Sequence, residues 1–143
     1  MNIISMIMPK MQVAYIYSDN TIRQGLEKFR AHGYTAIPVL TRDNTYYGTV
    51  TEGDFLRCLI DSGDVDIKDM EKKLISDIVR PGFNPCVHVD ITMNALFERS
   101  INQSFIPVVD DREYFVGIVT RQKIIRYFID EYNKVNNGAH KNG

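Results

Sequence analysis

Two copies of one sequence pattern run through this chain of 143 residues, and this internal repeat constrains the fold more than any other feature. Pro38 stands in the apolar run Ala-Ile-Pro-Val-Leu, and Pro107 stands 69 residues later in the run Phe-Ile-Pro-Val-Val. The same offset relates Gly48 to Gly117, Val50 to Val119 and Thr51 to Thr120. Glycine, proline and threonine seldom coincide by chance in one register, so we expect two copies of one supersecondary unit.

Both copies have the same expected order of elements: strand, helix, strand, strand and helix. Apolar residues alternate or recur at helical spacing in that order. In the first copy we expect strands at residues 13–17, 36–40 and 46–50, and helices at about 22–33 and 52–63. In the second copy we expect strands at residues 86–89, 105–109 and 114–119, and helices at about 91–103 and 121–133. The expected helix caps are Ser18, Asp19 or Asn20, then Thr51, Asp90 and Thr120.

The repeat also predicts how the chain divides. One β-α-β-β-α unit cannot bury both faces of its sheet, so the two units are expected to pack together as a single α+β fold. We expect residues 1–75 to hold the first repeat and a charged connector, and residues 76–135 to hold the second repeat. The polar chain end over residues 136–143 predicts a disordered tail.

Composition and missing motifs exclude several functional classes. A formal net charge of −1 provides no global attraction to nucleic acid or to an anionic membrane. The apolar start is short and its basic residue, Lys10, follows it, which is unlike a signal peptide, and no apolar run approaches the length of a membrane span. Cys58 and Cys86 form neither a CxxC motif nor a metal-like spacing with histidine. We therefore expect a cytoplasmic protein without a metal or cofactor, and the absence of catalytic motifs predicts that it is not an enzyme.

The two copies resemble the CBS motif. The first carries Tyr34-Thr-Ala-Ile-Pro-Val-Leu40 followed by Tyr47-Gly-Thr-Val-Thr-Glu-Gly-Asp54, and the second carries Ser104-Phe-Ile-Pro-Val-Val109 followed by Val116-Gly-Ile-Val-Thr-Arg121. The resemblance covers roughly residues 7–133. It implies a CBS pair, also called a Bateman module, with pseudo-two-fold symmetry between the repeats. It also implies two clefts between the sheets, adenosyl ligands in those clefts, and a flat homodimer.

The first of the two implied clefts contains Thr51 and Asp54. Thr51 begins a helix, whose free N–H groups favour a phosphate, and Asp54 matches the family's ribose-binding aspartate. The alternative is structural, because Thr-x-x-Asp is also a capping box. The resemblance places Ser104 and Phe105 across this first cleft, together with the strand at Cys86–His88. For the His88 ring, a satisfied structural role is expected rather than a ligand contact.

The second implied cleft contains Thr120, Arg121 and Lys123, with Lys123 at the position that Asp54 has in the first repeat. The helix dipole disfavours each cation in a first helical turn by roughly 0.3–1 kcal/mol, so a bound anion would explain both. The alternative is that both are solvated charges with no role. The resemblance adds six residues to this cleft: Val13, Ala14, Tyr15, Tyr34, Thr35 and Ala36. Tyr15 and Tyr34 are expected to stack on an adenine, with core or dimer packing as the alternative.

Part of the sequence is also similar to small stand-alone CBS proteins of Gram-positive bacteria that bind cyclic di-AMP. Those proteins tend to carry basic residues where this chain has Gln12 and Gln122. The expected function is therefore a non-enzymatic sensor of AMP, ADP, ATP or cyclic di-AMP that regulates a separate protein. Exposed apolar helix faces also predict a homodimer. The alternative function is a ligand-free structural dimerisation module.

Overall fold

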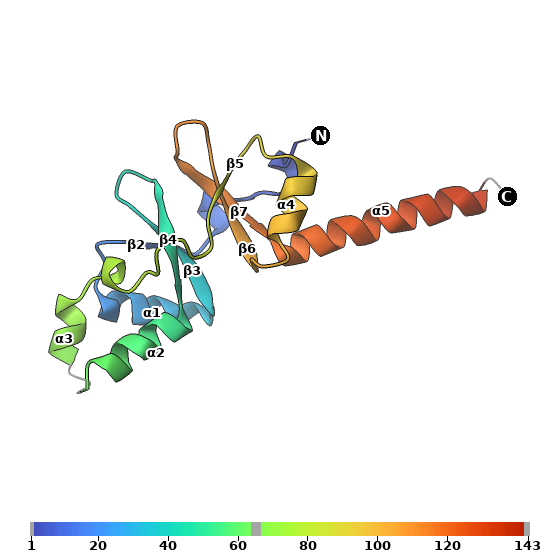
Figure 1. Ribbon diagram of the computed structural model, residues 1–143. Coiled ribbons are helices and arrows are strands. Elements are labelled where there is room, and N and C mark those ends of the chain that lie inside the picture. Colours follow the sequence, from blue (N-terminus) through green and yellow to red (C-terminus); the bar gives the residue numbers. More distant parts are fainter. Residues whose placement is uncertain (1, 64–66, 142–143) are drawn as a thin grey trace.

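The computed structural model describes residues 2–63 and 67–141, which form two sheets (Figure 1). The first sheet has the order β2 (Ile16–Tyr17), β3 (Ala36–Leu40) and β4 (Tyr46–Thr51). The second has the order β1 (Met8–Pro9), β7 (Phe115–Thr120), β6 (Phe105–Val109) and β5 (Val87–His88). In each sheet a two-residue strand runs parallel to the middle strand, which pairs antiparallel with the strand that follows it. The repeat predicted from the sequence is thus confirmed.

The helices flank the two sheets. The first half contains α1 (Ile22–His32), α2 (Glu52–Asp61) and α3 (Ile67–Lys72), and the second contains α4 (Met93–Arg99) and α5 (Arg121–Lys141). Short 3-10 turns lie at η1 (Ile4–Met6), η2 (Lys10–Gln12) and η3 (Ile75–Asp77). The helix α3 lies within the segment expected to be a charged connector. The α+β class and the β-α-β-β-α order of each repeat are as expected.

Two of the four expected helix caps are wrong. The N-cap of α1 is Thr21, whose Oγ1 accepts from the Gln24 N–H while the Gln24 side chain accepts from the Thr21 N–H. The expected cap Asn20 instead accepts from the Tyr17 N–H within the preceding turn, so its oxygen is already used. Likewise α4 begins after Thr92 and not after Asp90. The caps expected at Thr51 and Thr120 are confirmed.

The first strand of each repeat is shorter than expected. Pairing is confined to two residues in β2 and in β5, because the segments before them leave their own sheets and cross to the other half. Met8 pairs with Ile118 of β7, and Val79 lies against Gly48 of β4. The expected boundary at residue 75 therefore does not divide the chain cleanly. The N-terminal strand β1 lies before this boundary but belongs to the sheet of the second repeat.

Three buried clusters hold the molecule together. One joins the N-terminal Ile3 and Met6 to the second sheet and α4, and another fills the first half around Ile22 and Phe55. The third lies between the halves and contains Val13, Leu40, Phe105, Phe115 and Ile118. Because this last cluster draws on both repeats, the two halves share a core, as the sequence predicted.

The helix α5 is much longer than expected. It continues through Lys141, although a disordered tail was expected from residue 136, and its C-terminal part projects away from the sheets (Figure 1). No proline interrupts the segment, and its alternation of apolar and polar residues continues past the expected end at about residue 133. Residues 142 and 143 of the expected tail lie outside the described residues.

Candidate functional site

A cavity of about 500 Å³ opens between the two repeats, at the second of the two expected clefts. It brings together eight of the residues singled out from the sequence: Val13, Ala14, Tyr34, Thr35, Ala36, Ser104, Phe105 and Thr120. It also has six lining residues that the site prediction did not include: Met8, Gln12, Ile37, Pro38, Ile118 and Gln122. Ser104 and Phe105 thus line the second cleft, whereas the resemblance placed them across the first.

The repeat geometry explains why these residues meet. The Arg121 N–H donates to the Ser104 carbonyl at 2.9 Å, which holds the entry of β6 beside the start of α5. The equivalent bond in the first repeat joins the Glu52 N–H to the Thr35 carbonyl at 3.0 Å. Each middle strand therefore begins at the N-terminus of its own repeat's second helix. The crossing segment at residues 8–14 closes the cleft from the other side.

The second cleft combines an apolar interior with a polar mouth. Its interior is formed by Val13, Ile37, Phe105 and Ile118, together with Pro38, and it suits a flat aromatic group. Tyr34 at the mouth is about half exposed, and its ring stacks on the ring of His32 at a centroid distance of 5.7 Å. This ring is held in place at the cleft and remains accessible to a second stacking partner.

A smaller cavity of about 200 Å³ adjoins the second cleft and shares Met8, Gln12 and Thr120 with it. Lys123 lines this smaller cavity. Within the described part of the chain its ammonium group has no ion-pair partner. We call this smaller cavity the annex. A cation beside the start of α5 gives it a positive electrostatic potential, which favours the binding of a phosphate group.

Arg121 does not line either cavity. Its Nε donates to the Ser100 carbonyl at 2.8 Å, so its guanidinium group caps the C-terminal end of α4. The expectation that Arg121 faces an anion in the cleft is not met in this structure. The dipole of α4 offers the physical reason, since the negative end of that helix offsets the cost of a cation in the first turn of α5.

Tyr15 also differs from its expected position. Ala14 lines the cleft, whereas the Tyr15 ring does not line it and packs against the buried cluster between the two halves. The Tyr15 ring packs edge-on against Tyr17, and the ammonium groups of Lys10 and Lys28 lie over it at 5.0 and 5.7 Å from its centroid. This arrangement corresponds to the alternative of structural packing and not to stacking on an adenine.

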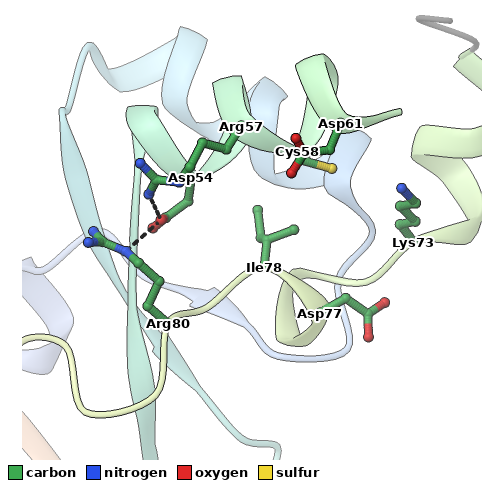
Figure 2. Close-up of a pocket in the computed structure, with 8 residues that line it drawn as sticks. All are labelled: Asp54, Arg57, Cys58, Asp61, Lys73, Asp77, Ile78 and Arg80. Atoms are coloured by element: carbon green, nitrogen blue, oxygen red, sulfur yellow. Dashed lines mark hydrogen bonds and ion pairs between the residues drawn. The ribbon is translucent and has the colours of Figure 1, made fainter. Parts of the chain in front are cut away.

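Asp54 is buried, and its carboxylate is bonded inside the protein. Its Oδ2 accepts from the Thr51 N–H at 2.8 Å, completing the capping box in which Thr51 Oγ1 accepts from the Asp54 N–H. Its Oδ1 accepts from Arg57 Nη2 at 2.5 Å and from Arg80 Nε at 2.8 Å, as Figure 2 shows. Both oxygens therefore have partners within the protein, and the capping box expected as the alternative to a ribose contact is present.

The arginines that hold Asp54 come from different segments. Arg57 lies one turn further along α2, whereas Arg80 lies on the crossing segment beside β4 (Figure 2). Together with Asp61, Lys73 and Asp77 they surround a cavity of about 390 Å³ between α2 and the segment at residues 73–80. Its lining residues carry three cationic and three anionic groups, so it has no net charge that would favour an anion. Sequence reasoning missed both arginines, because neither lies within the repeat motif.

The first cleft contains a network of side chains. Asn84, Gln103 and Thr49 are all buried there. Gln103 Nε2 donates to Asn84 Oδ1 and to the Pro85 carbonyl, both at 2.9 Å, and Asn84 Nδ2 donates to Thr49 Oγ1 at 3.0 Å. The hydroxyl of Tyr46 lies 2.7 Å from Thr49 Oγ1 and 2.6 Å from the Asn84 carbonyl.

Repeat equivalence shows how the clefts differ. Gln103 and Thr49 correspond to Tyr34 and Ile118, which lie 69 residues apart from them in sequence and line the second cleft. Asn84 lies three residues before β5, as Val13 lies three before β2. In the first cleft, polar residues that hydrogen-bond to one another thus take the positions that apolar residues and Tyr34 have in the second cleft. The pseudo-two-fold symmetry of the backbone is not matched by the chemistry of its two clefts.

The remaining titratable candidates have structural partners. His88 Nε2 and Glu113 Oε1 lie 2.5 Å apart, and this hydrogen bond raises the pKa of the His88 imidazole. Burial raises the pKa of the Cys86 thiol. Among the residues that the structure describes, no three histidines, cysteines or carboxylates gather as a metal site would require. Within the same residues no helix is both long and apolar enough to cross a membrane.

Comparisons with known proteins agree with the repeat. The sequence model of the CBS domain matches residues 4–61 and again residues 67–130. Cyclic di-AMP receptor B of Bacillus subtilis (strain 168) is 23% identical over 115 residues, covering 80% of this chain and 78% of that protein. CbpB in complex with c-di-AMP superposes with a TM-score of 0.86 at 20% identity, covering 96% of this chain and 91% of that one. CBSX2 in complex with AMP has a TM-score of 0.74 at 19% identity, covering 92% and 98%.

Proposed function

The chain belongs to the CBS domain family as a pair of such domains, and from this premise we propose that its second cleft binds an adenine nucleotide as a regulatory ligand. The observation that carries the proposal is the 500 Å³ cavity, in which residues of both repeats converge on an apolar interior with a polar mouth. A ligand held by both repeats changes the balance between shapes of the module, which is how a binding protein signals without catalysis.

The arrangement supports a distinct role for each part of the cleft. The apolar interior takes the adenine, while Tyr34 stacks on a base or on the ribose edge at the mouth. The amides of Gln12 and Gln122 provide donors and acceptors without charge. Thr120 and Lys123 lie at the start of α5, so they hold the phosphate in the annex. Thr35, Ala36, Ser104 and Phe105 shape the walls.

Among adenine nucleotides we propose cyclic di-AMP. Lys123 is the second-repeat equivalent of Asp54. At the motif position where the family's aspartate would bind a ribose diol, this cleft therefore has a cation instead. A cyclic dinucleotide has no free ribose diol, because its 3′ oxygen is esterified to phosphate. The two adjoining cavities also provide room for more than one nucleoside. The relative from Bacillus subtilis and the CbpB structure named above carry the same ligand in their names.

AMP is the second candidate, and the weak charge of the cleft favours it. Of the polar residues that line the two cavities, Lys123 is the one cation, and Gln12 and Gln122 are neutral. One cation suits a single phosphate better than the two phosphates of a cyclic dinucleotide. CBSX2 has been solved with AMP, so the fold accommodates that ligand in a relative.

Isothermal titration with cyclic di-AMP, AMP, ADP and ATP tests the proposal. We expect saturable binding of cyclic di-AMP and a loss of affinity of about tenfold in Lys123→Ala, since a charged hydrogen bond contributes about 1.5–3 kcal/mol. The matched control is Lys134→Ala, which removes an exposed cation from the same helix beyond either cavity. Tighter binding of AMP would assign the second candidate, and no binding of any nucleotide would support a ligand-free dimerisation module instead.

The wider setting is also proposed. We expect a cytoplasmic module that controls a separate protein and is not an enzyme, and its two unpaired cysteines agree with a reducing compartment. We also expect a homodimer, because α2 and α5 expose large apolar side chains. Affinity capture with and without nucleotide tests the control of a partner, and equal recovery of the same proteins in both conditions would count against it.

A further inference from the structure

The last part of α5 has no counterpart in the first repeat. Asp61, where α2 ends, corresponds to Asp130 at the offset of 69 residues, but α5 continues to Lys141. We call residues 131–141 the arm. At 1.5 Å per residue the arm adds about 16 Å of helix, and it leads away from both sheets (Figure 1).

The body of its own chain holds only the first half of α5. Ile124 is buried, and Tyr127 packs against the second-half cluster. The ring of Phe97 on α4 contacts the rings of Tyr127 and Phe128, at centroid distances of 5.8 and 4.4 Å. Beyond Phe128, Ile129, Tyr132 and Val135 are exposed, at 54%, 68% and 70%. Contacts within the chain therefore leave the apolar residues of the arm uncovered.

The exposed residues form one stripe along the helix. Ile125, Phe128, Tyr132 and Val135 recur at intervals of three, four and three residues, and Ile129 lies four residues after Ile125, which places all five on the same face. The alternation of three and four from Ile125 to Val135 is the spacing by which one helix packs along another. The stripe thus predicts a helical partner surface.

The same apolar face occurs twice in the chain. Leu56 and Ile60 of α2 are exposed, and they correspond to Ile125 and Ile129 of α5 at the repeat offset. Two copies of the chain therefore offer matching apolar helices to each other. A stable interface needs about 800 Å² from each partner. The seven exposed apolar side chains of α2 and α5 supply most of that area, since each exposes about half of its surface or more.

We infer that the arm lies across a second copy of this chain, with Tyr132 and Val135 packed on the partner's exposed helices. This inference rests on the homodimer proposed above and adds the segment that clasps it. The arm reaches past the body of its own chain, so a neighbouring copy is the surface that its stripe can cover. The stripe then continues the apolar face of the first half of α5 without a break.

Sedimentation equilibrium on the full chain tests the inference. The variant Tyr132→Glu/Val135→Glu places two charges in the stripe, and we expect its dimer dissociation constant to rise at least tenfold. The control Asn133→Glu/Asn137→Glu adds the same charges to exposed positions outside the stripe and is expected to dimerise as wild type does. Far-ultraviolet circular dichroism checks that both variants keep their helix content.

The outcomes separate the inference from the proposals on which it rests. A wild-type dimer that the arm variant leaves unchanged, while Leu56→Glu/Ile60→Glu dissociates it, would overturn the arm but keep the homodimer. A monomeric wild type at 100 μM, on the order of a weak physiological contact, would overturn both. Nucleotide binding is measured separately by titration, so neither result bears on the ligand of the second cleft.

Discussion

Gln103 donates a hydrogen bond from Nε2 to Oδ1 of Asn84 at 2.9 Å, and both side chains are buried in the first cleft. The repeat counterpart of Gln103 is Tyr34, a half-exposed ring at the mouth of the second cleft. The same backbone position thus supports a polar network in one half and an accessible aromatic surface in the other. This asymmetry underlies the proposal that nucleotide binds in the second cleft.

Substitution of Gln103 should lower stability, whereas substitution of its repeat counterpart Tyr34 should weaken nucleotide binding. Gln103→Leu leaves Asn84 Oδ1 and the Pro85 carbonyl without their donor, so the free energy of unfolding should fall by about 1–3 kcal/mol. Tyr34→Leu removes an exposed ring and should change stability by less than about 0.5 kcal/mol while weakening nucleotide binding. Urea denaturation and titration of both variants check this, and equal destabilisation of the two would contradict the account.

Asp54 is predicted to contribute to stability and not to nucleotide affinity. Asp54→Ala removes one half of the capping box of α2, the acceptor for the Thr51 N–H, and the shared partner of Arg57 and Arg80, so the free energy of unfolding should fall by about 1–2 kcal/mol. The loss stays modest because both arginines are about half exposed and can be solvated. Asp54→Asn keeps a capping oxygen and should lose less. A large loss of nucleotide affinity in Asp54→Ala would restore the ribose role expected from the sequence.

The glycines of the repeat should differ in their tolerance of a side chain. A Cβ at Gly117 would stand 2.1 Å from the backbone carbonyl oxygen of Met8, so Gly117→Ala must displace β1. A Cβ at Gly48 would stand 2.5 Å from a side-chain methyl group of Val79, which can shift more easily than backbone. Thermal denaturation should therefore show a larger loss in Gly117→Ala than in Gly48→Ala. The reverse order would argue against the pairing of β1 with β7.

The pair of His88 and Glu113 predicts a small pH dependence. The hydrogen bond to Glu113 raises the pKa of His88 in the folded state above its unfolded value of about 6.5. The stability that this pair adds is therefore fully present below pH of about 6.5, and it is lost as pH rises through the folded pKa. An NMR titration should show a lower pKa for His88 in Glu113→Gln than in wild type. An unchanged pKa would show that the contact does not persist in solution.

Much of the fold followed from the sequence because the repeat could be aligned with itself. The strands around Pro38 and Pro107 and the helices that begin after Thr51 and Thr120 lie where they were expected. The first strand of each repeat was overestimated, because the chain before it pairs with the opposite half, which no local pattern indicates. The helical arm was missed because its polar composition resembles that of a flexible tail.

The site was predicted in outline but not in its division between the clefts. Eight expected residues line the second cavity, yet Asp54 and Arg121 have partners inside the protein. The partners of Asp54 are Arg57, which lies outside the motif, and Arg80, which lies on a connecting segment. The partner of Arg121 is the Ser100 carbonyl, at the end of α4. Contacts of this kind depend on three-dimensional packing, so the repeat alone gave no signal for them.

The most direct test of the account is titration of cyclic di-AMP into wild type and into Ala36→Leu. Ala36 lines the second cleft, and three added carbon atoms should fill part of the space for the base while the fold remains intact. We predict one binding site per chain in wild type and an affinity at least tenfold weaker in Ala36→Leu, with wild-type affinity kept in Asp54→Asn. Binding that survives in Ala36→Leu but is lost in Asp54→Asn would place the nucleotide in the first cleft and contradict the account.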